Sequence, residues 1–288
     1  MHLPLPRIAA LALALALAAP AFADVGADAV VPEAEVERLG LFDCATGQPG
    51  DFAACLAGRG VAQAAIDFAE RLTAASDDMA GLLVGLSERG KVDLATILYP
   101  GAANANIQVA FVNGTDPLIL ASGLAVPAAT TPGAAALQAD RPDWMAAGPM
   151  ESAGYRDLPD GTQRFVLIDR ITDGCRACEV LAISVVAVDF RDGALSETAT
   201  LDWVPPAATL DGEAALAALV AGRVDVLQYR LLRAGHDIGG LDGAMGARTG
   251  TALAEFLAAH CLPEAADLAG LDRGSLEVIA GTASAACD

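Results

Sequence analysis

Lysine and histidine are scarce in this sequence of 288 residues. Lys91 is the only lysine, and the other basic residues, apart from three histidines, are arginines. The 37 acidic residues outnumber the 17 lysines and arginines, which gives a formal net charge of −20. Because nucleic acids and anionic lipids bind basic surfaces, this charge disfavours both as partners. An acidic chain is expected to stay in solution and to repel other polyanions.

A long apolar run is missing beyond residue 23. The chain begins with a basic residue, Arg7, an apolar run over 8–19 and the small-residue stretch Ala21-Phe22-Ala23. This order predicts a secretory signal peptide over residues 1–23. Its apolar part is shorter than the ~20 residues of a spanning helix, and no cysteine follows the cleavage site to carry a lipid. We therefore expect a protein of the periplasm, or a secreted one, without membrane insertion after cleavage.

All six cysteines follow residue 23, in a compartment where disulfides form. Many pairings are possible, and proximity along the chain favours Cys44–Cys55, Cys175–Cys178 and Cys261–Cys287. The spacing Cys175-x-x-Cys178 also occurs in thiol oxidoreductases and zinc sites. The redox motif acquires its low thiol pKa at a helix N-terminus, whereas here two predicted strands flank it, so a structural disulfide is favoured. A zinc site would need a second cysteine pair or two histidines, and we expect no metal and no cofactor.

The apolar pattern predicts helices first and strands afterwards. Residues 24–40 are polar and acidic and are interpreted as a leader. Residues 61–75 carry apolar side chains at helical spacing, and Ser76-Asp77-Asp78 is typical of a helix start. A second helix is therefore expected through Leu86, ending at Gly90.

Strands are predicted after these helices, and a two-residue hairpin turn is expected at Asn113-Gly114. The predicted strands cover residues 92–98, 107–112, 118–120, 164–171, 179–190 and 198–203. Residues 122–163 hold a functional loop or an element that the pattern does not reveal.

Pro205-Pro206 marks a boundary, and the chain after it has a helical pattern. The order predicts an α+β fold, in which helices and an antiparallel sheet occupy residues 41–204. A small all-α domain of three helices is expected over residues 211–288.

The residues from Val224 to Phe256 carry a specific joint spacing. Val224, Leu227 and Leu231 form one apolar stripe of a helix, which carries the pair Leu227-Gln228 and ends at Gly235. The loop Leu241-Asp242-Gly243-Ala244-Met245-Gly246 contains a tight Asp-Gly turn, and a second helix follows with Arg248, Thr249 and the stripe Ala252, Leu253, Phe256. This pattern resembles the three-helix peptidoglycan-binding-like domain of bacterial envelope proteins, over about residues 211–260. His236, Ala247 and Leu257 depart from the family, which more often has an aromatic residue, proline and glutamine there.

The resemblance implies peptidoglycan as the partner and a binding surface that includes His236, Asp237, Asp242, Arg248 and Thr249. Arg248 lies near a helix N-terminus, where a ligand carboxylate is favoured, or it is an ordinary solvated arginine. His236 stacks on a sugar or peptide, or it covers the end of the first helix. The residues before position 205 match no family that we recognise.

The scarcity of histidine and the absence of two catalytic motifs disfavour several enzymes of the cell wall. Zinc amidases and zinc carboxypeptidases need more histidines than His236 and His260, and the His-Gly-Cys and Ser-x-x-Lys motifs of transpeptidases are absent. We therefore expect a non-enzymatic envelope protein, anchored by its C-terminal module, whose first domain contacts an envelope protein. The alternatives are a wall hydrolase using two carboxylates, a thiol oxidoreductase, or a module that docks proteins without affinity for the wall.

Overall fold

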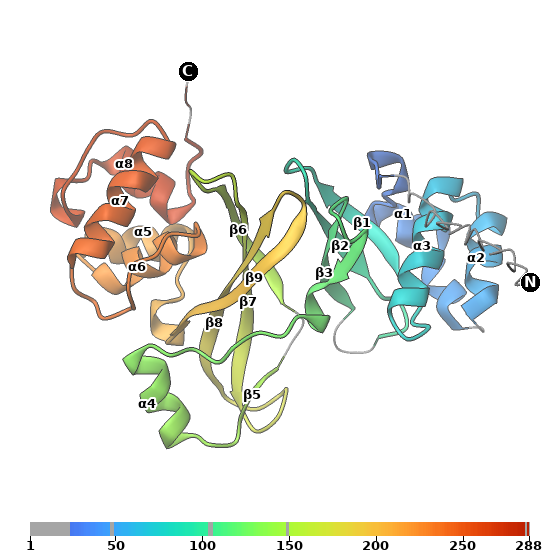
Figure 1. Ribbon diagram of the computed structural model, residues 1–288, viewed down its shortest axis with the longest axis horizontal. Coiled ribbons are helices and arrows are strands. Elements are labelled where there is room, and N and C mark those ends of the chain that lie inside the picture. Colours follow the sequence, from blue (N-terminus) through green and yellow to red (C-terminus); the bar gives the residue numbers. More distant parts are fainter. Residues whose placement is uncertain (1–23, 47–48, 103–105, 148–149, 286, 288) are drawn as a thin grey trace, which may run out of the picture.

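The computed structural model describes residues 24–46, 49–102, 106–147, 150–285 and 287. Helices, two antiparallel sheets and a second group of helices follow one another along its long axis (Figure 1). The predicted α+β fold is confirmed by this order. The predicted signal peptide, residues 1–23, lies outside the described residues. Within those residues, no helix is both long and apolar enough to cross a membrane.

The N-terminal helices pack against the first sheet. They are α1 (Glu33–Leu39), α2 (Pro49–Gly58) and α3 (Gln63–Ala75), with the 3-10 turns η1 (Ala27–Ala29) and η2 (Leu41–Thr46). The helix predicted over 61–75 is confirmed as α3, which buries Phe68 and Leu72. Residues 24–40, interpreted as a leader, place Val25, Val31 and Val36 in the apolar cores between these helices and the sheet.

The first sheet has four strands in sequence order: β1 (Leu82–Ser87), β2 (Asp93–Leu98), β3 (Ile107–Val112) and β4 (Leu118–Leu120). The helix predicted from Ser76 through Leu86 is wrong, because β1 occupies its second half. Asp77 and Asp78 have φ values of 50° and 64°, so they form a turn and not the first turn of a helix. β1 bulges after Leu83, and this interrupts the alternation of apolar residues that would identify a strand.

The two-residue turn predicted at Asn113-Gly114 is also wrong. β3 and β4 pair through Val112 and Leu118, so residues 113–117 form a longer loop. The Asn113 side chain accepts a hydrogen bond from the Val25 backbone and donates to the Asp93 carboxylate at 2.8 Å. These long-range bonds attach the N-terminal segment to the sheet, and they determine the loop conformation in place of a tight turn.

Residues 122–163 contain regular elements that the sequence pattern conceals. They are α4 (Pro132–Asp140), β5 (Trp144–Ala146) and β6 (Glu151–Asp157), preceded by the 3-10 turn η3 (Ala121–Gly123). α4 begins at the N-cap residue Thr131, and Ala134 is its buried apolar residue. Because alanine gives a weak apolar pattern, the periodicity of this short helix is hard to detect.

The second sheet contains the longest strands: two of them extend the predicted strands 164–171 and 198–203, and the third is shifted by one residue from the predicted strand 179–190. They are β7 (Gln163–Asp173), β8 (Val180–Arg191) and β9 (Ala194–Val204), in the order β5-β7-β8-β9 with β6 also paired to β7. Phe111 of the first sheet contacts Phe165 and Phe190 of the second, with ring centroids 5.1 and 4.9 Å apart. This aromatic cluster belongs to an apolar core that joins the two sheets.

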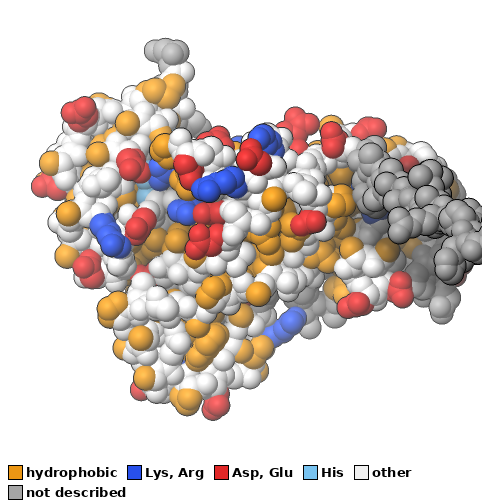
Figure 2. Space-filling model, viewed as in Figure 1, with side chains coloured by type: hydrophobic (Ala, Val, Ile, Leu, Met, Phe, Trp, Pro, Cys, Tyr) orange, Lys and Arg blue, Asp and Glu red, His pale blue; other side chains and the backbone are white. Residues whose placement is uncertain are grey.

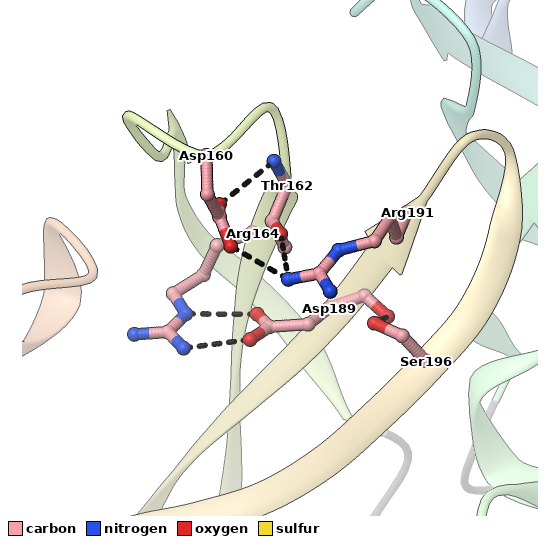
Figure 3. A network of polar contacts seen from close by, with 6 residues as sticks. All are labelled: Asp160, Thr162, Arg164, Asp189, Arg191 and Ser196. Atoms are coloured by element: carbon pink, nitrogen blue, oxygen red, sulfur yellow. Dashed lines mark hydrogen bonds and ion pairs between the residues drawn. The ribbon is translucent and has the colours of Figure 1, made fainter.

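One end of β7 and β8 carries a network of ion pairs (Figure 3). Arg164 and Asp189 are cross-strand neighbours, and Arg164 Nε and Nη2 donate to the two Asp189 carboxylate oxygens at 2.8 and 2.6 Å. This hydrogen bonding raises the pKa of Arg164 above its ordinary value. Arg191 donates to the carboxylate of Asp160, and so connects the β6–β7 turn to the end of β8.

Replacing Asp189 by asparagine is expected to lower the free energy of unfolding by about 2 kcal/mol, because the half-buried Arg164 loses its bidentate partner. Urea denaturation measures this loss. Asp192→Asn is the matched control, because it breaks the exposed pair between Lys91 and Asp192 and should cost less than about 0.5 kcal/mol. Equal losses in the two variants would contradict the prediction.

The chain after Val204 forms a helical layer on the second sheet. Its elements are α5 (Gly212–Val220), α6 (Val224–Arg233), α7 (Ala247–Ala259) and α8 (Arg273–Ala280), with the 3-10 turns η4 (Pro206–Ala208) and η5 (Leu268–Gly270). Their apolar side chains share one core with Val166, Val185 and Val204 of the sheet. A Cβ atom on Gly154 in β6 would lie only 2.0 Å from the carbonyl oxygen of Arg233 in α6, so strand and helix are in close contact.

The six cysteines pair as proximity along the chain predicts. Cys44–Cys55 joins η2 to α2, and Cys261–Cys287 connects the second residue after α7 to the end of the chain. Cys175–Cys178 closes the connection between β7 and β8, where residues 174–179 form a turn and not a helix start. Three disulfides indicate an extracytoplasmic protein.

Candidate functional site

Gln228 organises the loop between α6 and α7. Its side chain is buried, and Oε1 accepts hydrogen bonds from the backbone N–H groups of Asp242 and Gly243 at 3.1 and 2.8 Å. Nε2 donates to the Asp242 carboxylate at 2.8 Å and to the Ala244 carbonyl at 3.1 Å. The Leu-Gln pair of the first helix and the Asp-Gly turn are therefore parts of one hydrogen-bonded unit.

The Asp242 carboxylate is also part of this unit, because it accepts hydrogen bonds from the Gln228 side chain and from the Ala244 backbone. The hydrogen bond from Gln228, followed by the one from the Ala244 backbone N–H, lowers the pKa of Asp242 below its ordinary value. Gly243 has a φ of 73°, the left-handed conformation that the predicted Asp-Gly turn requires. The hydroxyl of the buried Thr249 lies 3.2 Å from Gln228 Nε2. Asp242 and Thr249 thus shape the loop, and the Thr249 side chain has little surface with which to contact a ligand.

A cleft of about 780 Å³, here called the main cleft, lies beside this loop. Its walls come from the start of α4, the end of β9, the loop 238–246 and the start of α7. The apolar part of its lining includes Pro132, Leu137, Leu181, Trp203, Ile238 and Leu241. Such a lining suits a ligand with methyl or methylene groups as well as polar ones.

Asp202 connects three walls of the main cleft. It is buried, and its carboxylate accepts hydrogen bonds from the Thr131 hydroxyl at the start of α4 and from the Leu241 backbone N–H, the latter at 2.8 Å. A third bond comes from its neighbour Trp203. The sequence analysis did not identify Asp202 as a site residue. The feature that could have indicated it is a single acidic residue among apolar ones, just before Trp203.

A second cleft of about 620 Å³ adjoins the main cleft at Arg248. It is lined by the β6–β7 turn and by α7, and it shares Ala247 and Arg248 with the main cleft. Figure 2 shows Lys and Arg side chains gathered, with Asp and Glu among them, where the C-terminal helices meet the second sheet. Arg164 lines this cleft, so the network of Figure 3 forms part of its wall.

Arg248 occupies the junction of the two clefts. Its side chain is 70% exposed, and its nearest acidic partner is Asp237, 3.7 Å from Nη1. This long and solvated ion pair restrains the guanidinium weakly. Arg248 also lies in the first turn of α7, whose N-cap residue Gly246 provides no side-chain cap. The guanidinium and the N–H groups of that turn together favour an anion at the junction.

Four of the five residues that the family resemblance implicates line the two adjoining clefts, and His236 does not. Asp242, Arg248 and Thr249 line the main cleft, and Asp237 lines the second cleft. His236 is buried against β6 and α7, where its Nδ1 lies 2.7 Å from Arg156 Nη1 and 3.3 Å from a Glu255 carboxylate oxygen. This burial favours the role in which His236 covers the helix end over the one in which it stacks on a ligand.

Burial and then the neighbouring Arg156 lower the pKa of His236 from 6.5 to about 4. Because the unfolded chain binds this proton more readily, the stabilising effect of neutral His236 is complete above pH 6.5 and is lost as the pH falls toward 4. The loss should reach about 2–4 kcal/mol. We expect the difference in unfolding free energy between the wild type and His236→Gln to shrink by that amount between pH 7 and pH 4. A difference that does not change with pH would contradict this.

No family model, curated protein or solved structure matches this chain. Within the described ranges, no group of three or more His, Cys, Asp or Glu side chains is arranged to hold a metal ion. The site consists of an exposed arginine, Arg248, between two adjoining clefts, of which the main cleft has an apolar wall and the second cleft has charged walls.

Proposed function

We propose that the protein is a non-enzymatic envelope protein of the bacterial periplasm that binds peptidoglycan. The binding surface would be the groove formed by the main cleft and the second cleft, with Arg248 at its centre. The observation that carries this proposal is that two clefts of about 780 and 620 Å³ share Arg248. A groove of this kind suits an extended polymer better than a compact small molecule.

The chemistry of the groove fits the stem peptides of the wall. A stem carboxylate would accept hydrogen bonds from the Arg248 guanidinium and from the first turn of α7. The neighbouring methyl groups of alanine and lactyl units would lie against the apolar lining near Trp203 and Leu241. The second cleft, with Arg164 and Glu255 in its wall, offers both signs of charge to the next unit of the polymer.

The charge distribution of residues 223–256 supports peptidoglycan binding at the groove. Residues 223–256 contain four arginines and four acidic residues, whereas the whole chain carries −20. A neutral segment approaches the carboxylates of the wall at a lower electrostatic cost than the rest of the surface. The signal peptide expected over residues 1–23 and the three disulfides agree with a periplasmic location.

Co-sedimentation with purified, insoluble sacculi tests the proposal. The mature chain, residues 24–288, is used whole, because its C-terminal helices share a core with the second sheet. We expect the protein to pellet with sacculi and to be displaced by soluble muropeptides. A chain that remains in the supernatant at every sacculus concentration would favour the alternative of a module that docks proteins without affinity for the wall.

A further inference from the structure

A third pocket, distinct from the groove, lies between α6, α7, α8 and β6. Its volume is about 560 Å³, and we call it the basic pocket because Arg156, Arg230, Arg233, His236 and His260 line it. Arg156 is the only lining residue that it shares with the second cleft, and it shares none with the main cleft. Three arginines line this one cavity in a chain that carries 37 acidic residues.

Two of these arginines have no carboxylate partner among the described residues. Arg230 donates from Nε to the Ile279 carbonyl at 2.7 Å, at the end of α8. Arg233 lies over the Tyr229 ring, 5.7 Å from its centroid. These contacts position the guanidinium groups without neutralising them. A half-buried arginine without a counter-ion is costly, and a bound anion would offset that cost.

The titratable groups around the pocket respond to its positive charge. The pKa of Arg230 is lowered by burial and then by Arg233. The pKa of His236 is lowered by burial and then by Arg156, with a further contribution from His260. Burial is the larger cause in both groups, and neighbouring cations act in the same direction.

Two acids near the pocket, Asp157 and Glu255, already have partners, and a third, Asp211, acts on Arg230 through its charge, against the larger effects of burial and Arg233 on the Arg230 pKa. Asp157 accepts a hydrogen bond from the Tyr155 hydroxyl at 2.6 Å. Glu255 accepts one from Arg156 at 3.0 Å, and it also contacts His236. On α8 the pocket is lined by Val278 and Ile279, which are apolar, and α7 adds Phe256 beside them. The pocket therefore combines positive charge at one side with an apolar wall at the other.

We propose that the basic pocket binds a small organic oxyanion, whose carboxylate or phosphate group lies between Arg230 and Arg233 and whose apolar part packs against Phe256, Val278 and Ile279. This site does not depend on peptidoglycan binding, because the groove and the pocket have only Arg156 in common. A ligand here would bridge α6 and α8 and would restrain the helical layer.

Nuclear magnetic resonance of the His236 ring in the chain 24–288 tests the proposal. Benzoate and phenyl phosphate are the probes, and inorganic phosphate is the bare anion. We expect saturable shifts of the His236 resonances, and a rise in its pKa by about one unit with at least one aromatic probe. The probe that binds more tightly identifies the carboxylate or the phosphate as the natural group. The absence of saturable binding by all three probes would overturn the proposal.

Arg233→Gln is the diagnostic variant, because the contacts of Arg233 are with the Tyr229 side chain and involve no carboxylate. It should weaken binding of the better probe about tenfold, a change expected when one charge-assisted contact is removed. Arg223→Gln is the matched control: Arg223 precedes α6 and pairs with Asp225, outside the pocket lining. Equal affinities of Arg233→Gln and the wild type would overturn the proposal. Arg230→Gln provides a second variant should Arg233→Gln unfold.

Discussion

Replacing Gln228 by leucine is expected to lower the free energy of unfolding by about 3 kcal/mol. Leucine has a similar volume, so the loss comes from hydrogen bonds and not from a cavity. The backbone N–H groups of Asp242 and Gly243 and the hydroxyl of Thr249 would lose their partner. Each buried polar group left without a partner costs about 1–3 kcal/mol, and the partial exposure of the loop reduces that sum. Chemical denaturation of the chain 24–288 measures the change.

Gln138→Leu is the matched control for this substitution. Gln138 lies in α4 and makes one side-chain hydrogen bond, from Nε2 to the Ala129 carbonyl at 2.9 Å. Its replacement should cost about 1 kcal/mol. If Gln228→Leu costs no more than Gln138→Leu, Gln228 does not organise the loop 238–246, and the shape of the main cleft has another cause.

Replacing Arg248 by glutamate should weaken the binding of sacculi by at least about tenfold, and by up to about a hundredfold. Charge reversal removes a charge-assisted hydrogen bond worth about 1.5–3 kcal/mol and adds repulsion of the stem carboxylates. The free energy of unfolding should change little, because the Arg248 side chain is 70% exposed and only distantly paired. Dissociation constants from co-sedimentation isotherms at fixed ionic strength measure the effect.

Arg273→Glu controls for the change in net charge. Arg273 is also an exposed helical arginine, paired with Glu277 in α8 and outside both clefts. Its replacement should leave binding within about twofold of the wild type, since a distant exposed charge is largely screened. Wild-type affinity in Arg248→Glu would show that the groove is not centred on Arg248. A similar loss in both variants would indicate attraction by net charge alone.

The parts of the fold with a strong local signal were predictable. β7 and β8 are long runs of β-branched and apolar residues, and the turn at Asp242-Gly243 requires the left-handed conformation that glycine adopts at low cost. β1 was mistaken for a helix because its bulge interrupts the alternating pattern. α4 was concealed because alanines supply most of its apolar surface.

The candidate site was predictable only in part, because long-range contacts build it. The spacing from Val224 to Phe256 anticipated that Asp242, Arg248 and Thr249 belong together. It could not reveal that Asp202 joins the loop to α4, since those bonds span 39 and 71 positions along the chain. The second cleft depends on the packing of α7 against the β6–β7 turn, and the burial of His236 depends on Arg156 in β6.

The most direct test of the central claim is a titration of isotope-labelled chain 24–288 with soluble muropeptides, followed by backbone amide resonances. The account predicts saturable shifts at Gly239, Gly240 and residues 242–249, with smaller shifts in the β6–β7 turn, and loss of these shifts in Arg248→Glu. Shifts confined to surfaces outside the two clefts, or no saturable shifts at all, would contradict the proposal that this groove binds peptidoglycan.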